Sequence, residues 1–267
     1  MTPTLAQTKS LDSAPNRAMP FSRVLRAYAV EAKYESLRML RAPAFAGPFL
    51  ALPVGLYLLF GVLLFGAAIA KDPKASVFIF MGFSIFGVMG PGMFGFGITI
   101  ASEREQGLLK LKRALPMPAA ASLIAKMLMS MLFAAIVMVT MIAAAGPLGH
   151  VPLGAGQILT FAVVNTLGSI PFCALGFLIG SFASAKAAPA FVNLLYLPMI
   201  YLSGILFVLP KSMKWIATLS PAYHLDQLAL ASMGFPADGS ALIHILVLAG
   251  VSWAFTTLAM RRLAKVG

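Results

Sequence analysis

Long apolar stretches without a charged residue alternate with short polar segments along this chain. The charge-free stretches are 42–70, 75–102, 127–185, 187–210 and 239–260. A helix that crosses a bilayer needs about 20 mainly apolar residues, because no backbone polar group can stay unpaired in hydrocarbon. The stretch 127–185 is too long for one helix and is divided by the Gly and Pro residues of 145–156, so it holds two. The pattern predicts an all-α integral membrane protein with six spans, at about 44–70, 77–101, 120–145, 156–182, 188–208 and 240–260.

The composition agrees with a membrane protein and excludes several other classes. Hydrophobic residues make up 60% of the chain and charged residues 10%, far from the balance of a soluble domain. The net charge of +12 does not indicate a nucleic-acid partner, because the Lys and Arg residues lie between apolar runs instead of forming one solvated face. The expected surroundings are the lipid bilayer. A single cysteine, Cys173, excludes an internal disulfide and a cysteine-based metal site.

The distribution of Lys and Arg predicts the orientation of the spans. Seven of these residues precede position 42, five lie in 103–126, Lys186 adds one and the C-terminal tail adds three, so sixteen lie on one side against four on the other. Basic residues near span ends favour the cytoplasm. We therefore expect a multi-pass protein of the cell membrane with both termini in the cytoplasm. Residues 1–20 are polar, predict a disordered tail and do not match a cleaved signal peptide.

Two further segments have the pattern of amphipathic helices. The first, 21–41, is expected to lie in the cytoplasmic interface, with a cytoplasmic extension of the first span as the alternative. The second, 210–236, follows the fifth span and is divided by Pro221. We expect two short helices that dip into the outer leaflet, because one extra crossing would move the C-terminus to the opposite side.

A short charged segment follows the second span and stands out from the apolar chain. Six charged residues fall within 103–113. Ser102 and Glu105 match the S-x-x-E capping box, so Ser102 is predicted to cap a short cytoplasmic helix at about 103–114, which Pro116 and Pro118 would end. A cap alone does not account for Gly107 or for the basic cluster that follows it.

This segment resembles the corresponding part of ABC-2 type transporter permeases. Those proteins carry an E-R-E-x-G-[TL]-L core, then a proline pair and a lysine that opens the third span. The matching residues here are Glu103, Arg104, Glu105, Gly107, Leu108, Pro116, Pro118 and Lys126. The segment "LPKSMKWIATLSPAYHLDQLALA" is similar to that family's outer segment between spans five and six.

The resemblance implies a permease that pairs with a second permease copy and docks on a separate ABC-type ATPase subunit. It implies that the charged segment is a coupling helix, with Glu103, Arg104 and Glu105 as docking residues and Gly107 permitting close approach. No G-x-x-x-x-G-K-[ST] phosphate loop occurs in the chain, so ATP and Mg are expected on the partner and the chain is expected not to be an enzyme. The implied activity is export of an unidentified drug-, lipid- or glycan-like substrate. The alternative is a non-transporting six-span protein, either an assembly scaffold or an intramembrane enzyme.

The second span is rich in Gly and Phe and carries a proline. Its residues Phe83, Phe86, Pro91 and Phe94 are candidates for a wall of the translocation path, with ordinary helix packing as the alternative. Apart from Lys126 near one end, no charged residue falls inside a predicted span, which disfavours an ion-coupled mechanism. The three histidines, His150, His224 and His244, are expected to be isolated interfacial residues rather than a metal or haem site.

Overall fold

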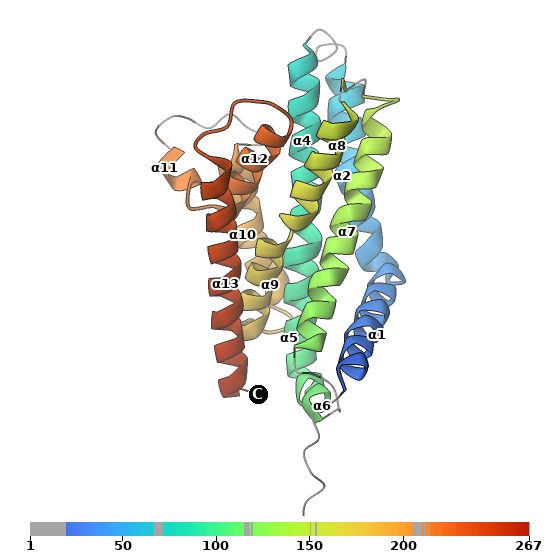
Figure 1. Cartoon of the computed structure of the whole chain (residues 1–267), viewed down its shortest axis with the longest axis vertical. Helices are drawn as coiled ribbons and strands as arrows, with labels where there is room; N and C mark the ends of the chain where they lie inside the picture. The colour runs from blue at the N-terminus through green and yellow to red at the C-terminus, as the bar shows by residue number, and fades with distance from the viewer. Residues whose placement is uncertain are drawn as a thin grey trace, which may run out of the picture.

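The computed structural model shows an all-helical bundle over the residues that it describes. These are 20–66, 72–114, 118, 120–149, 151–152, 154–204, 210, 212 and 214–266. Figure 1 shows the long helices running side by side along the long axis of the molecule. The beginning of α1 (Phe21–Leu40), the short α6 (Leu108–Ala114) and the C-terminal end of α13 (Ala241–Val266) all lie at the same end of the bundle, which we call the α6 end. The predicted tail 1–20 falls almost entirely outside the described residues.

Among the described residues, five helical stretches are long and apolar enough to cross a membrane, which confirms the predicted class of protein. They are Pro43–Leu64, Lys74–Glu105, Ala121–Ala145, Ala155–Phe182 and Ala241–Lys265. The helices that form them are α2 (Pro43–Leu56) with η1 (Tyr57–Leu64), α4 (Pro73–Gly90) with η2 (Pro91–Phe96) and α5 (Gly97–Glu105), α7 (Ala121–Ala145), α8 (Ala155–Leu167) with α9 (Ile170–Phe182), and α13.

The predicted fifth span corresponds to a shorter apolar helix, α10 (Ala188–Ser203). It ends where Gly204 adopts the left-handed backbone conformation, with φ of 78°. The predicted remainder of this span, 205–208, lies outside the described residues, as does 67–70 of the first.

The second span occupies the centre of the bundle. In its most apolar window 78% of the residues are buried, against 11% in the first and last spans, whose apolar side chains face outward. Close backbone contact between η2, α5 and α9 depends on two glycines of α9. A Cβ atom at Gly176 would lie 2.7 Å from the carbonyl oxygen of Gly92, and one at Gly180 would lie 2.5 Å from that of Gly97. Small residues therefore bring α9 directly against the central span.

Pro91 interrupts the hydrogen-bond ladder of the second span without ending the helix. The residues from Pro91 to Phe96 form a π-helical turn, which joins α4 to α5 in one continuous helical stretch. Proline has no N–H to donate and commonly disturbs the ladder in this way. The effect of Pro91 on this span is therefore a widened turn inside a continuous helix.

In the described part of the segment after α10 there are two short helices, as the position of Pro221 predicts. They are α11 (Lys214–Ala217) and α12 (Pro221–Ser232), and α12 begins at that proline. Figure 1 shows them near the end of the bundle opposite to α6. At the other end, α1 is a helix over nearly the whole predicted segment 21–41 and packs against α7. The location of these short helices in a membrane interface stays a prediction.

Candidate functional site

The charged segment is built as the end of the second span followed by a sharp turn. The span continues through Ser102 to Glu105, so the predicted helix start at Ser102 is wrong. The Ser102 hydroxyl accepts a hydrogen bond from the Gln106 side chain, 2.9 Å away, and does not cap a helix. The true boundary is Gly107, which has φ of 71° and lets the chain turn into α6. The apolar residues before Ser102 keep the helix going, so its S-x-x-E pattern finds no free helix start to cap.

Gly107 serves the turn rather than a close contact inside this chain. A Cβ atom at this position would meet no other atom within 4 Å, so space alone would admit a side chain there. The positive φ is what favours glycine. The predicted close approach of a partner at Gly107 stays a prediction.

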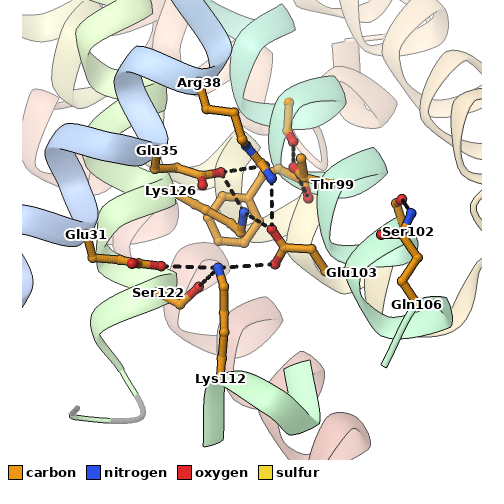
Figure 2. Close-up of polar contacts among 12 residues, drawn as sticks. Glu31, Glu35, Arg38, Thr99, Ser102, Glu103, Gln106, Lys112, Ser122 and Lys126 are labelled. Atoms are coloured by element: carbon orange, nitrogen blue, oxygen red, sulfur yellow. Dashed lines mark hydrogen bonds and ion pairs between the residues drawn. The ribbon is translucent and has the colours of Figure 1, made fainter. Parts of the chain in front are cut away.

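Glu103 and Lys126 meet inside the bundle. The Lys126 ammonium, with 0% of its side chain exposed, lies 2.9 Å from Oε1 of Glu103 and 2.6 Å from Oε1 of Glu35. Figure 2 shows the two carboxylates converging on this ammonium from α1 and α5, while Lys126 reaches them from α7. Buried charges persist only when they are paired, so this contact holds three helices together.

More charged residues complete the contact and neutralise it. Arg38 lies 2.9 Å from Glu35 and 3.4 Å from Glu103, and Lys112 of α6 lies 3.1 Å from Glu31 and 3.6 Å from Glu103. We call these six side chains, three acidic and three basic, the ionic cluster: Glu31, Glu35, Arg38, Glu103, Lys112 and Lys126. Figure 2 shows Ser122 beside Lys112, to which it is hydrogen-bonded at 3.0 Å.

The cluster controls the ionisation of Glu35. Burial alone would raise the pKa of this carboxyl group, but the charge and hydrogen bond of Lys126, together with the charges of Arg38 and Lys112, lower the pKa overall. Glu35 therefore stays ionised at neutral pH despite its burial, and the ion pairs persist.

These contacts change the role assigned to Glu103. Only 3% of its side chain is exposed, so it faces the bases of its own chain and cannot act as a surface docking residue in this conformation. Arg104 is also turned inward: its guanidinium donates hydrogen bonds to the carbonyl oxygens of Ser181 and Ala183, where α9 ends. A cation at the C-terminal carbonyls of a helix is favourable, so Arg104 ties the charged segment to α9.

The outward-facing part of the segment is the turn itself and the adjoining face of α6. Of the three charged residues predicted to dock, Glu105 alone is exposed. Gln106, Lys110 and Leu111 are exposed beside it along the chain, and Leu111 shows 62% of its surface to solvent. We call these four residues the exposed tip. It carries one acid, one base, an amide and a large apolar side chain, which suits contact with another protein.

The aromatic residues of the second span divide into two groups. Phe86 and Phe94 line an apolar cleft of about 290 Å³ between α2, the second span and α10. The other lining residues are Pro48, Phe49, Leu52, Pro53, Gly87, Asn193, Tyr196 and Leu197. The Tyr196 hydroxyl donates a hydrogen bond to the Phe86 carbonyl oxygen at 2.7 Å. Phe83 and Pro91 belong instead to the buried interior, so two of the four predicted wall residues, Phe86 and Phe94, line this cleft.

Comparison with known proteins identifies the family to which this chain belongs. The sequence model described as ABC-2 type transporter matches residues 27–234, which is well over half of the chain. The chain belongs to the ABC-2 type transporter family. A protein of Bacillus subtilis (strain 168) named "Putative transport permease YvfS" is 25% identical over 193 residues, which cover 71% of this chain and 78% of that protein. This chain is thus a multi-pass membrane protein of a transport permease family.

The match to ABC-2 transporters includes the ionic cluster and the exposed tip. It begins inside α1, before Glu31, and extends past α12. The residues that sequence reasoning missed here are Glu31, Glu35, Arg38 and Lys112. One signal was available: the chain has only eight acidic residues, and two of them stand four apart on a helix otherwise rich in Arg. A lysine in an apolar span needs such partners.

Two of the three histidines also differ from expectation. His150 lies outside the described residues. His224 and His244 are not isolated, because their Nδ1 atoms lie 2.8 Å apart. The two residues lie on different helices, and no sequence pattern predicts this contact. In the part of the chain that the structure describes, no group of three or more His, Cys, Asp or Glu residues could hold a metal ion.

Proposed function

We propose that this ABC-2 family chain is the permease subunit of an ATP-driven exporter, working with a second permease copy and a separate ATP-hydrolysing subunit. Family membership supports a transport role. The observation that carries the proposal is the construction of the α5–α6 turn: its base is fixed inside the bundle by the ionic cluster, while its exposed tip faces away from the bundle. On this proposal the α6 end and both termini face the cytoplasm.

The ionic cluster gives the turn a mechanical role. Glu103 sits at the end of α5, Lys112 on α6, Lys126 on α7 and Glu35 on α1, so a displacement of the tip moves all four helices together. An ATPase whose contact with the tip differs between its nucleotide states would then change the arrangement of the central span. ATP and Mg²⁺ belong to that partner, and this chain's own residues transmit the motion.

The apolar cleft supports an amphipathic substrate. Phe86, Phe94 and Phe49 supply adaptable apolar surface, and Asn193 and the Tyr196 hydroxyl supply the few polar atoms near it. A second copy facing α2 and α10 would enclose this cleft and turn it into a path. We therefore propose lipid-like or drug-like molecules as the cargo, moved outward.

The exposed tip offers a direct test. In the triple variant Glu105→Lys, Lys110→Glu and Leu111→Asp, each changed side chain is exposed, so the fold should be retained. We expect an ATPase subunit that co-purifies with the wild-type chain from host membranes to be lost from the variant. ATP hydrolysis by the purified complex should fall in parallel. The measurements are quantitative mass spectrometry of the purified complex and its hydrolysis rate.

The matched control is Arg261→Glu, another exposed charge reversal near the same end of the bundle. It should leave both readouts unchanged. Undiminished co-purification of an ATPase with the triple variant would remove the exposed tip as the docking surface, and a wild-type chain that exports without any ATPase would remove the proposed function itself.

A further inference from the structure

The pair of histidines at the end opposite to α6 forms a hydrogen-bonded chain between two backbone carbonyl groups. The Nε2 atom of His224 lies 2.9 Å from the Thr218 carbonyl oxygen, and that of His244 lies 2.7 Å from the Asp238 carbonyl oxygen. Between them the two Nδ1 atoms face each other at 2.8 Å. Both rings are buried, with 6% and 4% of their surface exposed.

The number of protons in this arrangement follows from its partners. A carbonyl oxygen only accepts hydrogen bonds, so each Nε2 atom must carry a hydrogen. A contact of 2.8 Å between two Nδ1 atoms needs one donor and one acceptor. The four ring nitrogens therefore carry three hydrogens, and the pair has one net positive charge. Two neutral rings would place two lone pairs in contact, and two charged rings would place two N–H groups in contact.

We infer that His224 and His244 form a binding site for a single shared proton, which fastens α12 to α13. The inference does not depend on the proposed transport function. The pair closes when it holds that one proton and separates when the proton is lost or when a second one is added. Because only the intermediate state is closed, the contact between α12 and α13 is strongest over a limited range of pH.

The surroundings restrict the pair to a single charge. Burial lowers the pKa of His224; the hydrogen bond to Thr218 opposes this effect, and positive charge on His244 adds to it, so burial and the neighbouring charge both disfavour a second proton on the pair. Tyr223 of α12 lies beside both rings, with its ring centroid 5.5 and 6.2 Å from theirs, and the other titratable groups of the adjoining segments are Asp226 of α12, Lys214 of α11 and Asp238 of the connecting loop. Asp238 lies next to the site, and its pKa is lowered mainly by the Lys214 hydrogen bond and to a small extent by the charge of His244.

The site joins several segments at this end of the bundle. Thr218 follows α11, Asp238 belongs to the loop between α12 and α13, and the two imidazoles bridge α12 and α13. The same loop is held by a hydrogen bond from the Asp238 amide to the Gln227 side chain, at 2.7 Å. A proton at one place thus stabilises the packing of the short helices on the last span.

Nuclear magnetic resonance of the full chain tests the proton count directly. The chain has three histidines, so the variant His150→Gln, labelled with ¹⁵N-histidine in lipid nanodiscs, shows the pair alone. We expect both Nε2 atoms to be protonated and one proton to be shared by the Nδ1 atoms, with measurable ¹⁵N–¹⁵N coupling across the hydrogen bond. Two neutral rings at every pH, two independent titrations, or signals that change when a metal chelator is added would overturn the inference.

Variants of His244 supply a second readout, in a background with Asp226→Asn so that this carboxyl group does not titrate. In that background the chain with both histidines should melt roughly 2–4 °C lower at about pH 9 than at its optimum. His244→Gln can donate to His224 without binding a proton, so its melting temperature should not fall on the alkaline side. His244→Phe should melt lower throughout and lose the pH optimum. An unchanged alkaline fall in both variants would also overturn the inference.

Discussion

Buried polar groups have different kinds of partners at the two ends of the bundle. At the α6 end, six charged side chains from α1, α5, α6 and α7 neutralise one another. At the other end, two imidazoles between backbone carbonyl groups depend on a single proton. The first arrangement pairs side chains of opposite charge, whereas the second depends on the number of protons that two histidines hold. A permease thus combines a rigid end with a responsive one.

Removing the central cation should give the largest effect. Lys126→Met leaves Glu35 and Glu103 buried without their main partner, and we expect a loss of about 3–5 kcal/mol in the free energy of unfolding. Denaturant unfolding in detergent would measure it. The triple variant Lys126→Met, Glu35→Gln and Glu103→Gln should recover much of the loss, since no charge stays unpaired. If the single variant were as stable as the exposed control Lys265→Met, the α6 end would not be the rigid one.

The two glutamates of the charged segment form a matched pair for the next test. Glu103→Gln weakens ion pairs to buried and half-buried bases, so it should lower the free energy of unfolding by about 1–3 kcal/mol. Glu105 is exposed, so Glu105→Gln should leave the free energy of unfolding within about 0.5 kcal/mol of the wild-type value. Reversal of Glu105 to Lys should instead weaken association with an ATPase. Equal stability losses in the two Gln variants, measured by the same unfolding assay, would contradict the separation of the segment into a buried base and an exposed tip.

The responsive end contains a carboxyl group that titrates near neutral pH. Burial raises the pKa of Asp226 to about 7 from an ordinary value of 3.8, with the Gln227 hydrogen bond acting in the opposite direction. Because the folded pKa lies above the unfolded one, this group favours folding at low pH, and that contribution is lost as pH rises between about 4 and 7. Asp226→Asn should therefore be more stable than the wild type at pH 8 and equal to it at pH 4. Thermal melting at both values checks this, and a variant destabilised at pH 8 would contradict the burial effect.

The smallest effect is expected at the surface of the same end. Lys214 pairs with Asp238 at 2.9 Å, but their side chains are 55% and 57% exposed. Lys214→Met should therefore lower the free energy of unfolding by less than about 1 kcal/mol. Its melting temperature should approach that of the wild type as salt is added, because exposed pairs are screened. A loss comparable to that of Lys126→Met would erase the distinction between buried and exposed pairs.

The helical elements could be predicted from the sequence more easily than the contacts between them. Charge-free length and the Gly and Pro residues of 145–156 predict where spans fall, because the cost of unpaired backbone groups in hydrocarbon depends on local composition. The family resemblance rests on local motifs in the same way. The capping box at Ser102 failed because a cap requires a free helix end, and the preceding apolar residues continue the helix through it. Glu103 was predicted on the surface for a related reason: a charged residue after a span is usually solvated, and only its distant partners bury it.

The sequence by itself determined that this protein is helical, lies in a membrane and belongs with the permeases whose charged segment it shares. These properties follow from residues that are neighbours in the chain. The tertiary structure alone decided which charges face inward. Glu35, Glu103 and Lys126 lie on three helices, and the packing of these helices brings both carboxylates within 3 Å of the Lys126 ammonium. It likewise brought His224 of α12 to His244 of α13, on the two sides of the connecting loop. A buried charge is stable only beside its partner, so its role depends on helix packing that local sequence does not encode.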